Sequence, residues 1–283
     1  MTSGSTDQFH TNWISRDETN YLHWTRSTPN NQIQFAFRQN WLTFDQILKE
    51  YGITEPGSAL EVGCGRGSMS AYFADNAWKV TLLDYSEKAI ATAKQLFLAH
   101  DLSAEFTVAD CLDMPFPDES YDAIFSIGLF EHFQDVSNLI AEQARLLKPN
   151  GVLIGYVVPD YSSNSSNIQS RFNAVNKILE HLHRNGPDEP ANTKSDIFRS
   201  DYSSQIYLEE MSKHSLTNLT SFGVYPLPMI SHSTAFPFSL MDSYSESILV
   251  NDFNAQLSNV NTKFPWRCAE GFGQAFIVAG QKN

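Results

Sequence analysis

Three glycines in a short loop are the first residues that could bind a ligand. Gly63, Gly65 and Gly67 occupy every second position in the loop that joins a predicted strand to a predicted helix. Glycine permits a tight turn and lets the backbone approach a ligand closely. The loop therefore predicts a place where backbone amides meet a bound molecule.

Carboxylates at the ends of neighbouring strands strengthen this prediction. Asp84 ends the next predicted strand and Asp110 ends the one after it, while Glu61 lies just before the glycine loop. In a doubly wound sheet, ligands bind in the crevice at the carboxyl ends of the strands. The spacing from Gly63 to Asp84 to Asp110 predicts a slot with the dimensions of a nucleoside.

The elements that must position these residues alternate between strand and helix. The alternation predicts a Rossmann-like α/β fold, a mostly parallel sheet with helices on both faces. The expected strands are 59–62, 78–83, 104–109, 121–127, 152–158, 216–224 and 274–279. The expected helices are 33–48, one that follows an N-cap at Ser86, 136–147, 168–183 and 205–214.

The chain divides by composition into a core and covering segments. We expect an N-terminal helical lid over residues 1–56 and a core domain over 57–283. That domain contains cap insertions at about 160–204 and 225–270, which are rich in Ser, Asn, Pro and Phe. No internal repeat is visible.

The span from Leu60 to about Val158 resembles the class I S-adenosylmethionine-dependent methyltransferases, in their UbiE-like small-molecule branch. Glu61-x-Gly63-x-Gly65-x-Gly67 is similar to the family's first motif, and residues 113–122 and 147–152 are similar to the approaches to its fourth and fifth strands. The resemblance implies a seven-stranded sheet and S-adenosylmethionine as cofactor. It implies that Asp84 binds the ribose hydroxyls and Asp110 the adenine amino group. The cofactor-binding residues that it implies are Glu61, Gly63, Gly65, Gly67, Asp84, Tyr85, Asp110, Cys111 and Ile127.

The methyl acceptor is expected beside Glu131 and His132, directly after the fourth strand. Methyl transfer is an in-line displacement that needs a well-positioned nucleophile, and a base adds rate if the acceptor carries a proton. This loop resembles that of cyclopropane fatty acid synthases and coclaurine-type N-methyltransferases. The alternative for His132 is a capping or packing role. Tyr21, Trp24 and Phe133 are the expected acceptor contacts, with Tyr21 and Trp24 as a lid.

Composition and charge indicate which kinds of binding partner the protein is expected to have. The net charge of -13 and pI near 4.9 disfavour nucleic acid. Three cysteines without CxxC spacing favour a reducing, cytoplasmic setting, and the sequence predicts no membrane span. His181 and His183 point apart on a predicted helix, so no metal site is expected. The sequence indicates no oligomeric state.

Several functions remain open from sequence. O- or N-methylation of a small molecule is favoured over C-methylation, a cyclopropane-synthase-like reaction or a catalytically silent S-adenosylmethionine-binding protein. An NAD-dependent oxidoreductase is the remote alternative, because an acidic residue after the second strand also binds the ribose of NAD. The dehydrogenase fingerprint is GxGxxG, however, and here Ser68 stands where its third glycine belongs.

Overall fold

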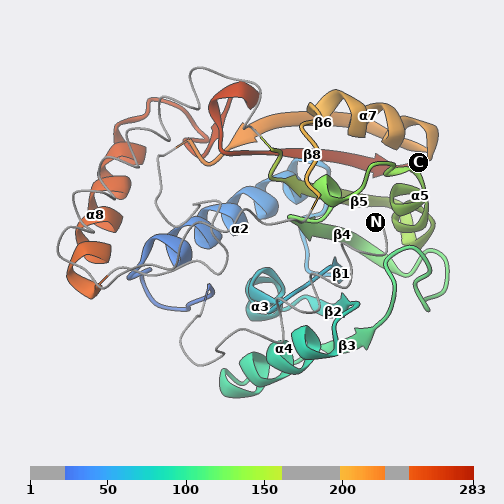
Figure 1. Ribbon diagram of the computed structural model, residues 1–283, viewed down its shortest axis with the longest axis horizontal. Helices are drawn as coiled ribbons and strands as arrows, with labels where there is room; N and C mark the ends of the chain where they lie inside the picture. The colour runs from blue at the N-terminus through green and yellow to red at the C-terminus, as the bar shows by residue number, and fades with distance from the viewer. Residues whose placement is uncertain (1–22, 161–197, 227–241) are drawn as a thin grey trace.

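One eight-stranded sheet forms the centre of the computed structural model, which describes residues 23–160, 198–226 and 242–283 (Figure 1). The strand order is β3-β2-β1-β4-β5-β8-β6-β7. The strands are β1 Ser58–Val62, β2 Lys79–Asp84, β3 Glu105–Val108, β4 Tyr121–Ile127, β5 Leu147–Val157, β6 Leu216–Val224, β7 Arg267–Cys268 and β8 Ala275–Lys282. All seven expected strands are present, but the sheet has eight strands rather than seven. The additional β7 has two residues, too few to show any periodicity in sequence.

Strands β1 to β5 are parallel, and β8 runs antiparallel between β5 and β6. The register brings the predicted ligand residues together, because Val62 pairs with Leu83 and Asp84 pairs with Val108. The glycine loop, Asp84 and Asp110 therefore leave the sheet at one edge.

The described helices are α2 Gln32–Glu50, α3 Ser68–Asp75, α4 Glu87–Ala99, α5 Ser137–Leu146, α7 Ser204–Lys213 and α8 Ser243–Asn259. Alternate strand residues belong to two hydrophobic clusters, one on each face of the sheet. Phe125 of β4 packs against Phe44 of α2 and Phe73 of α3. The neighbouring Ile124 faces the other cluster with Leu139 of α5.

Side-chain caps begin two of the helices that precede and follow β1 and β2. The Asn31 side chain accepts a hydrogen bond from the Gln34 amide and begins α2, and the Ser86 side chain accepts one from Ala89 and begins α4 as expected. The helix expected at 168–183 lies outside the described residues. Helix α8 was not expected, although Val250, Phe253 and Leu257 recur at helical spacing and are buried.

Candidate cofactor and acceptor site

The glycine loop bends around the carboxyl end of β2. Gly63, Gly65 and Gly67 all have positive φ, at 70°, 53° and 71°. The amides of Gly63 and Cys64 both donate to the Leu83 carbonyl, at 2.8 and 2.9 Å. A Cβ on Gly67 would lie 2.3 Å from Leu82 Cδ2. The third glycine is thus required by conformation and by packing.

Asp84 organises this loop. Its Oδ2 accepts a hydrogen bond from the Gly65 amide at 2.9 Å, and its Oδ1 accepts one from Ser86 at 2.8 Å. Burial raises the pKa of the Asp84 carboxyl, while the Ser86 and Gly65 amides oppose that rise. Each oxygen accepts only one of these bonds, so both keep capacity for a ligand hydroxyl.

Glu61 acts on α3 from within the sheet. Its Oε2 accepts a hydrogen bond from the Ser70 amide at 3.0 Å, in the first turn of that helix. The side chain is 3% exposed, and burial raises its pKa to about 8. Glu61 therefore holds the helix that follows the loop, and its effect on a cofactor would be indirect.

Asp110 and Cys111 follow β3, the third strand at the carboxyl edge of the sheet. Asp110 is exposed, and its Oδ1 accepts a hydrogen bond from the Leu112 amide at 2.9 Å. The Ala109 amide donates to the Asp84 carbonyl at 3.2 Å, which joins the ends of β2 and β3. Cys111 is half-buried, and burial raises the pKa of its thiol to about 12.

Apolar side chains border the same edge. Tyr85 is 56% exposed and Leu112 is 38% exposed. Ile127 ends β4 and is half-buried. Leu129 Cδ1 would lie 3.2 Å from a Cβ on Gly63. The sequence analysis did not predict Leu112 and Leu129 at this edge, although Leu112 directly follows Cys111 and Leu129 lies two residues after Ile127.

Glu131 and His132 lie in a 3-10 turn, η1 Phe130–His132, after β4. Their side chains are 1% and 6% exposed, and His132 Nε2 is 4.0 Å from Glu131 Oε1. Glu131 Oε1 accepts a bond from the Val158 amide at 3.3 Å, and a Cβ on Gly128 would lie 3.5 Å from the same oxygen. The carboxyl group thus lies at the carboxyl ends of β4 and β5.

Burial sets the charge states of this pair. It raises the pKa of Glu131 to about 7 and lowers the pKa of His132 to about 4. At neutral pH the imidazole is therefore uncharged. Glu131 Oε2 is buried and has no hydrogen-bond partner among the described residues.

The expected aromatic acceptor contacts are not exposed. Trp24 is 1% exposed and packs edge-on against Tyr72 and His100, and its role as a lid stays a prediction. Phe133 is 2% exposed and belongs to the hydrophobic cluster beneath α5, and its contact with the acceptor stays a prediction. Both rings are buried because they fill the core. Tyr21 lies outside the described residues.

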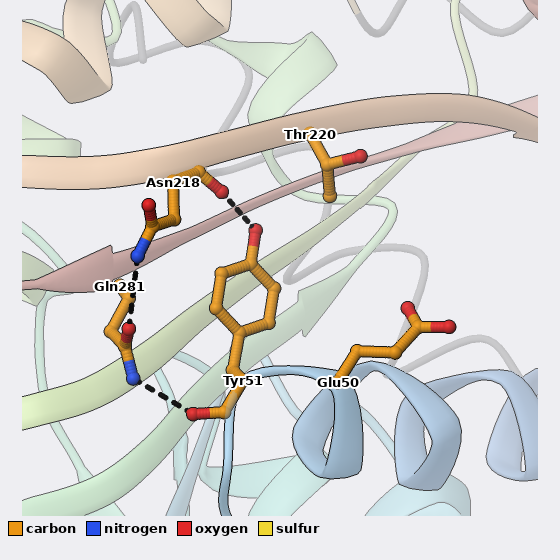
Figure 2. Close-up of a pocket in the computed structure, with 5 residues that line it drawn as sticks. All are labelled: Glu50, Tyr51, Asn218, Thr220 and Gln281. Carbon is orange, nitrogen blue, oxygen red and sulfur yellow. Dashed lines mark hydrogen bonds between the residues drawn. The ribbon is translucent and has the colours of Figure 1, made fainter.

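A separate hollow of about 320 Å³ lies at the opposite edge of the sheet, between the C-terminal end of α2 and strands β6 and β8 (Figure 2). The Tyr51 hydroxyl donates to the Asn218 carbonyl, and Gln281 Nε2 donates to the Tyr51 carbonyl at 2.9 Å. Gln281 pairs with Val152, far along β5 from its carboxyl end. This hollow is distinct from the predicted slot.

Two further observations on the described residues concern metal sites and membrane spans. Over residues 23–160, 198–226 and 242–283, no three His, Cys, Asp or Glu side chains are grouped as a metal site would need. The helices of these same ranges include none with the length and apolar character to cross a bilayer.

The sheet order, with one antiparallel strand between β5 and β6, is that of the class I S-adenosylmethionine-dependent methyltransferase fold. Residues 60–155 match the family model described as a methyltransferase domain. The chain therefore contains a class I methyltransferase domain, and the cofactor of that class is S-adenosylmethionine.

Individual relatives agree on the domain and differ in their acceptors. The 2-methyl-6-phytyl-1,4-hydroquinone methyltransferase of Synechocystis is 32% identical over 42% of this chain and 38% of its own length. A Bos taurus protein named "Probable tRNA methyltransferase 9B" is 36% identical over 41% of this chain and 24% of its own length. These matches span well under half of the relatives. The structure of PH0226 from Pyrococcus horikoshii has the same fold over 90% of this chain and 94% of its own, with a TM-score of 0.51 and 16% identity.

Proposed function

We propose that the protein transfers the methyl group of S-adenosylmethionine to a small-molecule acceptor, with oxygen or nitrogen as the favoured acceptor atom. The observation that carries the proposal is the hydrogen bond between Asp84 and the Gly65 amide, with Asp110 at the neighbouring strand end. The cofactor supplies a methyl group on a positively charged sulfur. The protein must hold the acceptor in line with it and exclude water.

The residues at the edge fit this cofactor. Asp84 would accept hydrogen bonds from the ribose hydroxyls, and Asp110 and the Cys111 amide would meet the adenine, with Tyr85 and Ile127 beside it. The Ser68 hydroxyl, at the start of α3, is buried without a hydrogen-bond partner among the described residues. Such an atom is expected where a polar ligand completes the site.

His132 and Glu131 are the candidates for handling an acceptor proton. An uncharged imidazole can take a proton from a hydroxyl or amine as the methyl group transfers, and such a base adds on the order of 10² to 10⁴ in rate. The buried Glu131 carboxyl, with a pKa of about 7, can bind the acceptor or hold the proton. The alternative of a silent S-adenosylmethionine-binding protein predicts cofactor binding without turnover in a metabolite extract.

The titration that tests the cofactor compares two ligands. Calorimetry with S-adenosylhomocysteine should give saturable binding, while NADH should give none. At about 100 times its Kd, S-adenosylhomocysteine should stabilise the fold by about 2.7 kcal/mol. Binding of NADH alone would refute the proposed cofactor.

The proposed setting is the cytoplasm and the proposed partner is a metabolite rather than a nucleic acid. Neither Cys64 nor Cys111 forms a disulfide in the described part of the chain, which suits a reducing compartment. The net charge of -13 disfavours contact with phosphate backbones. Methyl transfer to bulk tRNA, measured beside a metabolite extract, would contradict this part of the proposal if tRNA alone were labelled.

A further inference from the structure

Residues 198–200 form a strap across η1, the turn that carries Glu131 and His132. The Ser200 amide donates to the Glu131 carbonyl at 2.7 Å. The Phe198 carbonyl lies 2.7 Å from His132 Nδ1. The strap thus contacts the backbone of one residue of the pair and the side chain of the other.

The strap is attached in turn to β5 and α7. The Asp160 amide, just beyond β5, donates to the Ser200 carbonyl at 2.8 Å. The Ser200 hydroxyl lies 3.0 Å from the Tyr207 hydroxyl of α7, and both groups are buried. Tyr207 is fully buried, and its ring packs against Phe130 and Phe276 at 5.8 and 5.9 Å between centroids. The position of Ser200 is therefore set by a ring that the core holds in place.

The bond to Phe198 determines which nitrogen of His132 carries the proton. A carbonyl oxygen only accepts, so Nδ1 must donate to it. In an uncharged imidazole Nε2 then has no proton, and Nε2 is the nitrogen 4.0 Å from Glu131 Oε1. Loss of the strap's position would remove this constraint on the tautomer.

We propose that Ser200 and Tyr207 are positioning residues, which hold the strap so that the Phe198 carbonyl keeps His132 in the tautomer with a proton-accepting Nε2. This inference rests on the proposed function. In that reaction the methyl carbon forms a bond to the acceptor's oxygen or nitrogen while its bond to sulfur breaks, and Nε2 takes the proton that the acceptor atom loses. Neither residue needs to touch the acceptor.

Nitrogen NMR of the histidine rings in the full-length protein tests the proposal without a known acceptor. The signal of His132 is assigned by its loss in His132→Gln. The wild type should show an Nδ1-protonated ring whose titration midpoint lies well below 6.5. Ser200→Ala and Tyr207→Phe should give mixed tautomers, with a signal from an Nε2-protonated ring that the wild type lacks.

Matched variants separate positioning from general packing. The Tyr202 ring lies beside Tyr207, and its hydroxyl donates to the Gln134 carbonyl. Tyr202→Phe removes this hydroxyl without removing a bond to the strap, so it should leave the His132 signal unchanged. Ser200→Thr keeps the hydroxyl and should restore the wild-type tautomer. Wild-type signals in both Ser200→Ala and Tyr207→Phe, or an Nε2-protonated ring in the wild type, would overturn the proposal.

The same samples distinguish a failure of the proposed function. Ser200→Ala and Tyr207→Phe should bind S-adenosylhomocysteine within about twofold of the wild type. If the wild type itself does not bind S-adenosylhomocysteine, the proposed function fails while the NMR result still decides the role of the strap. If Tyr207→Phe does not fold, Ser200→Ala and Ser200→Thr decide it.

Discussion

Asp84 combines two tasks in one side chain, since it fixes the Gly65 amide and faces the proposed ribose site. Asp84→Asn keeps one oxygen for a backbone amide but loses the charge. We expect S-adenosylhomocysteine to bind about 1.5 to 3 kcal/mol more weakly, because hydrogen bonds to a charged group contribute about this much. Calorimetry measures the change. Asp45→Asn, a half-buried carboxylate paired with Lys49, is the control, and equal affinities in the two variants would contradict the assignment.

Glu61 is a buried carboxyl whose charge opposes folding. Its pKa is about 8 in the folded protein and about 4.5 when unfolded, so the folded state binds more protons between these values and stability falls as pH rises through them. Glu61→Gln removes the titration and keeps an oxygen for the Ser70 amide. Between pH 5.5 and 8, the wild type should lose at least about 1 kcal/mol more unfolding free energy than the variant.

Urea unfolding at the two pH values measures this difference, with Glu105→Gln as an exposed control. Glu131 also has a raised pKa, but it contributes equally to wild type and variant. Parallel losses of stability in wild type and Glu61→Gln would show that the Glu61 carboxyl titrates outside this range.

Single residues differ in how well sequence predicts them. Gly63, Asp84 and Asp110 belong to local motifs at strand ends, so their meeting follows from a parallel sheet. The contact of His132 with Phe198 spans 66 positions and depends on a loop that no local pattern describes. The burial of Trp24 was not predicted, because an aromatic ring in a polar segment gives no signal of the core partners that bury it.

At the scale of elements, the glycine loop packs closely against β2, because Gly67 approaches the Leu82 side chain. Gly67→Ala should cost about 1 to 2 kcal/mol for its positive φ and about 1 to 3 kcal/mol more for the clash with Leu82. Gly52→Ala is a matched control, because Gly52 has φ of 87° and no atom within 4 Å of a new Cβ. Chemical unfolding compares the two, and equal losses would exclude the packing contribution.

Strands and helices with strong periodicity were predicted closely, and the misses have physical causes. Strand β4 has the predicted bounds, 121–127. Strand β5 begins at Leu147 rather than at 152. Leu147 already pairs with Tyr121 of β4, and the register then shifts before Ala123 pairs with Val152. Proline and glycine predict a turn from sequence, and only the partner strand shows that the backbone stays paired.

At the scale of the whole molecule, α8 and the segment after it pack against α2, the first described helix. Its Glu246 side chain accepts a hydrogen bond from the Gln32 amide at 2.8 Å, at the first residue of α2 and 214 positions away. Trp266 follows α8, packs on Phe35 of α2 and donates to Asn40 at 2.8 Å. Figure 1 shows α8 at the periphery, beside the N-terminal end of α2. A buried carboxylate at a helix N-terminus satisfies an amide that α2 itself leaves unpaired.

Removing this contact should weaken the molecule without changing the cofactor slot. Glu246→Ala leaves the Gln32 amide buried without this acceptor, which should cost about 1 to 3 kcal/mol and lower Tm by about 2 to 10 °C. Glu209→Ala, an exposed residue of α7, should stay within about 0.5 kcal/mol of the wild type. Calorimetric melting measures both variants, and titration with S-adenosylhomocysteine should give the wild-type Kd for each. If Glu246→Ala melts with the control, α8 does not stabilise α2; if it melts normally but binds the ligand weakly, α8 acts on the cofactor slot instead.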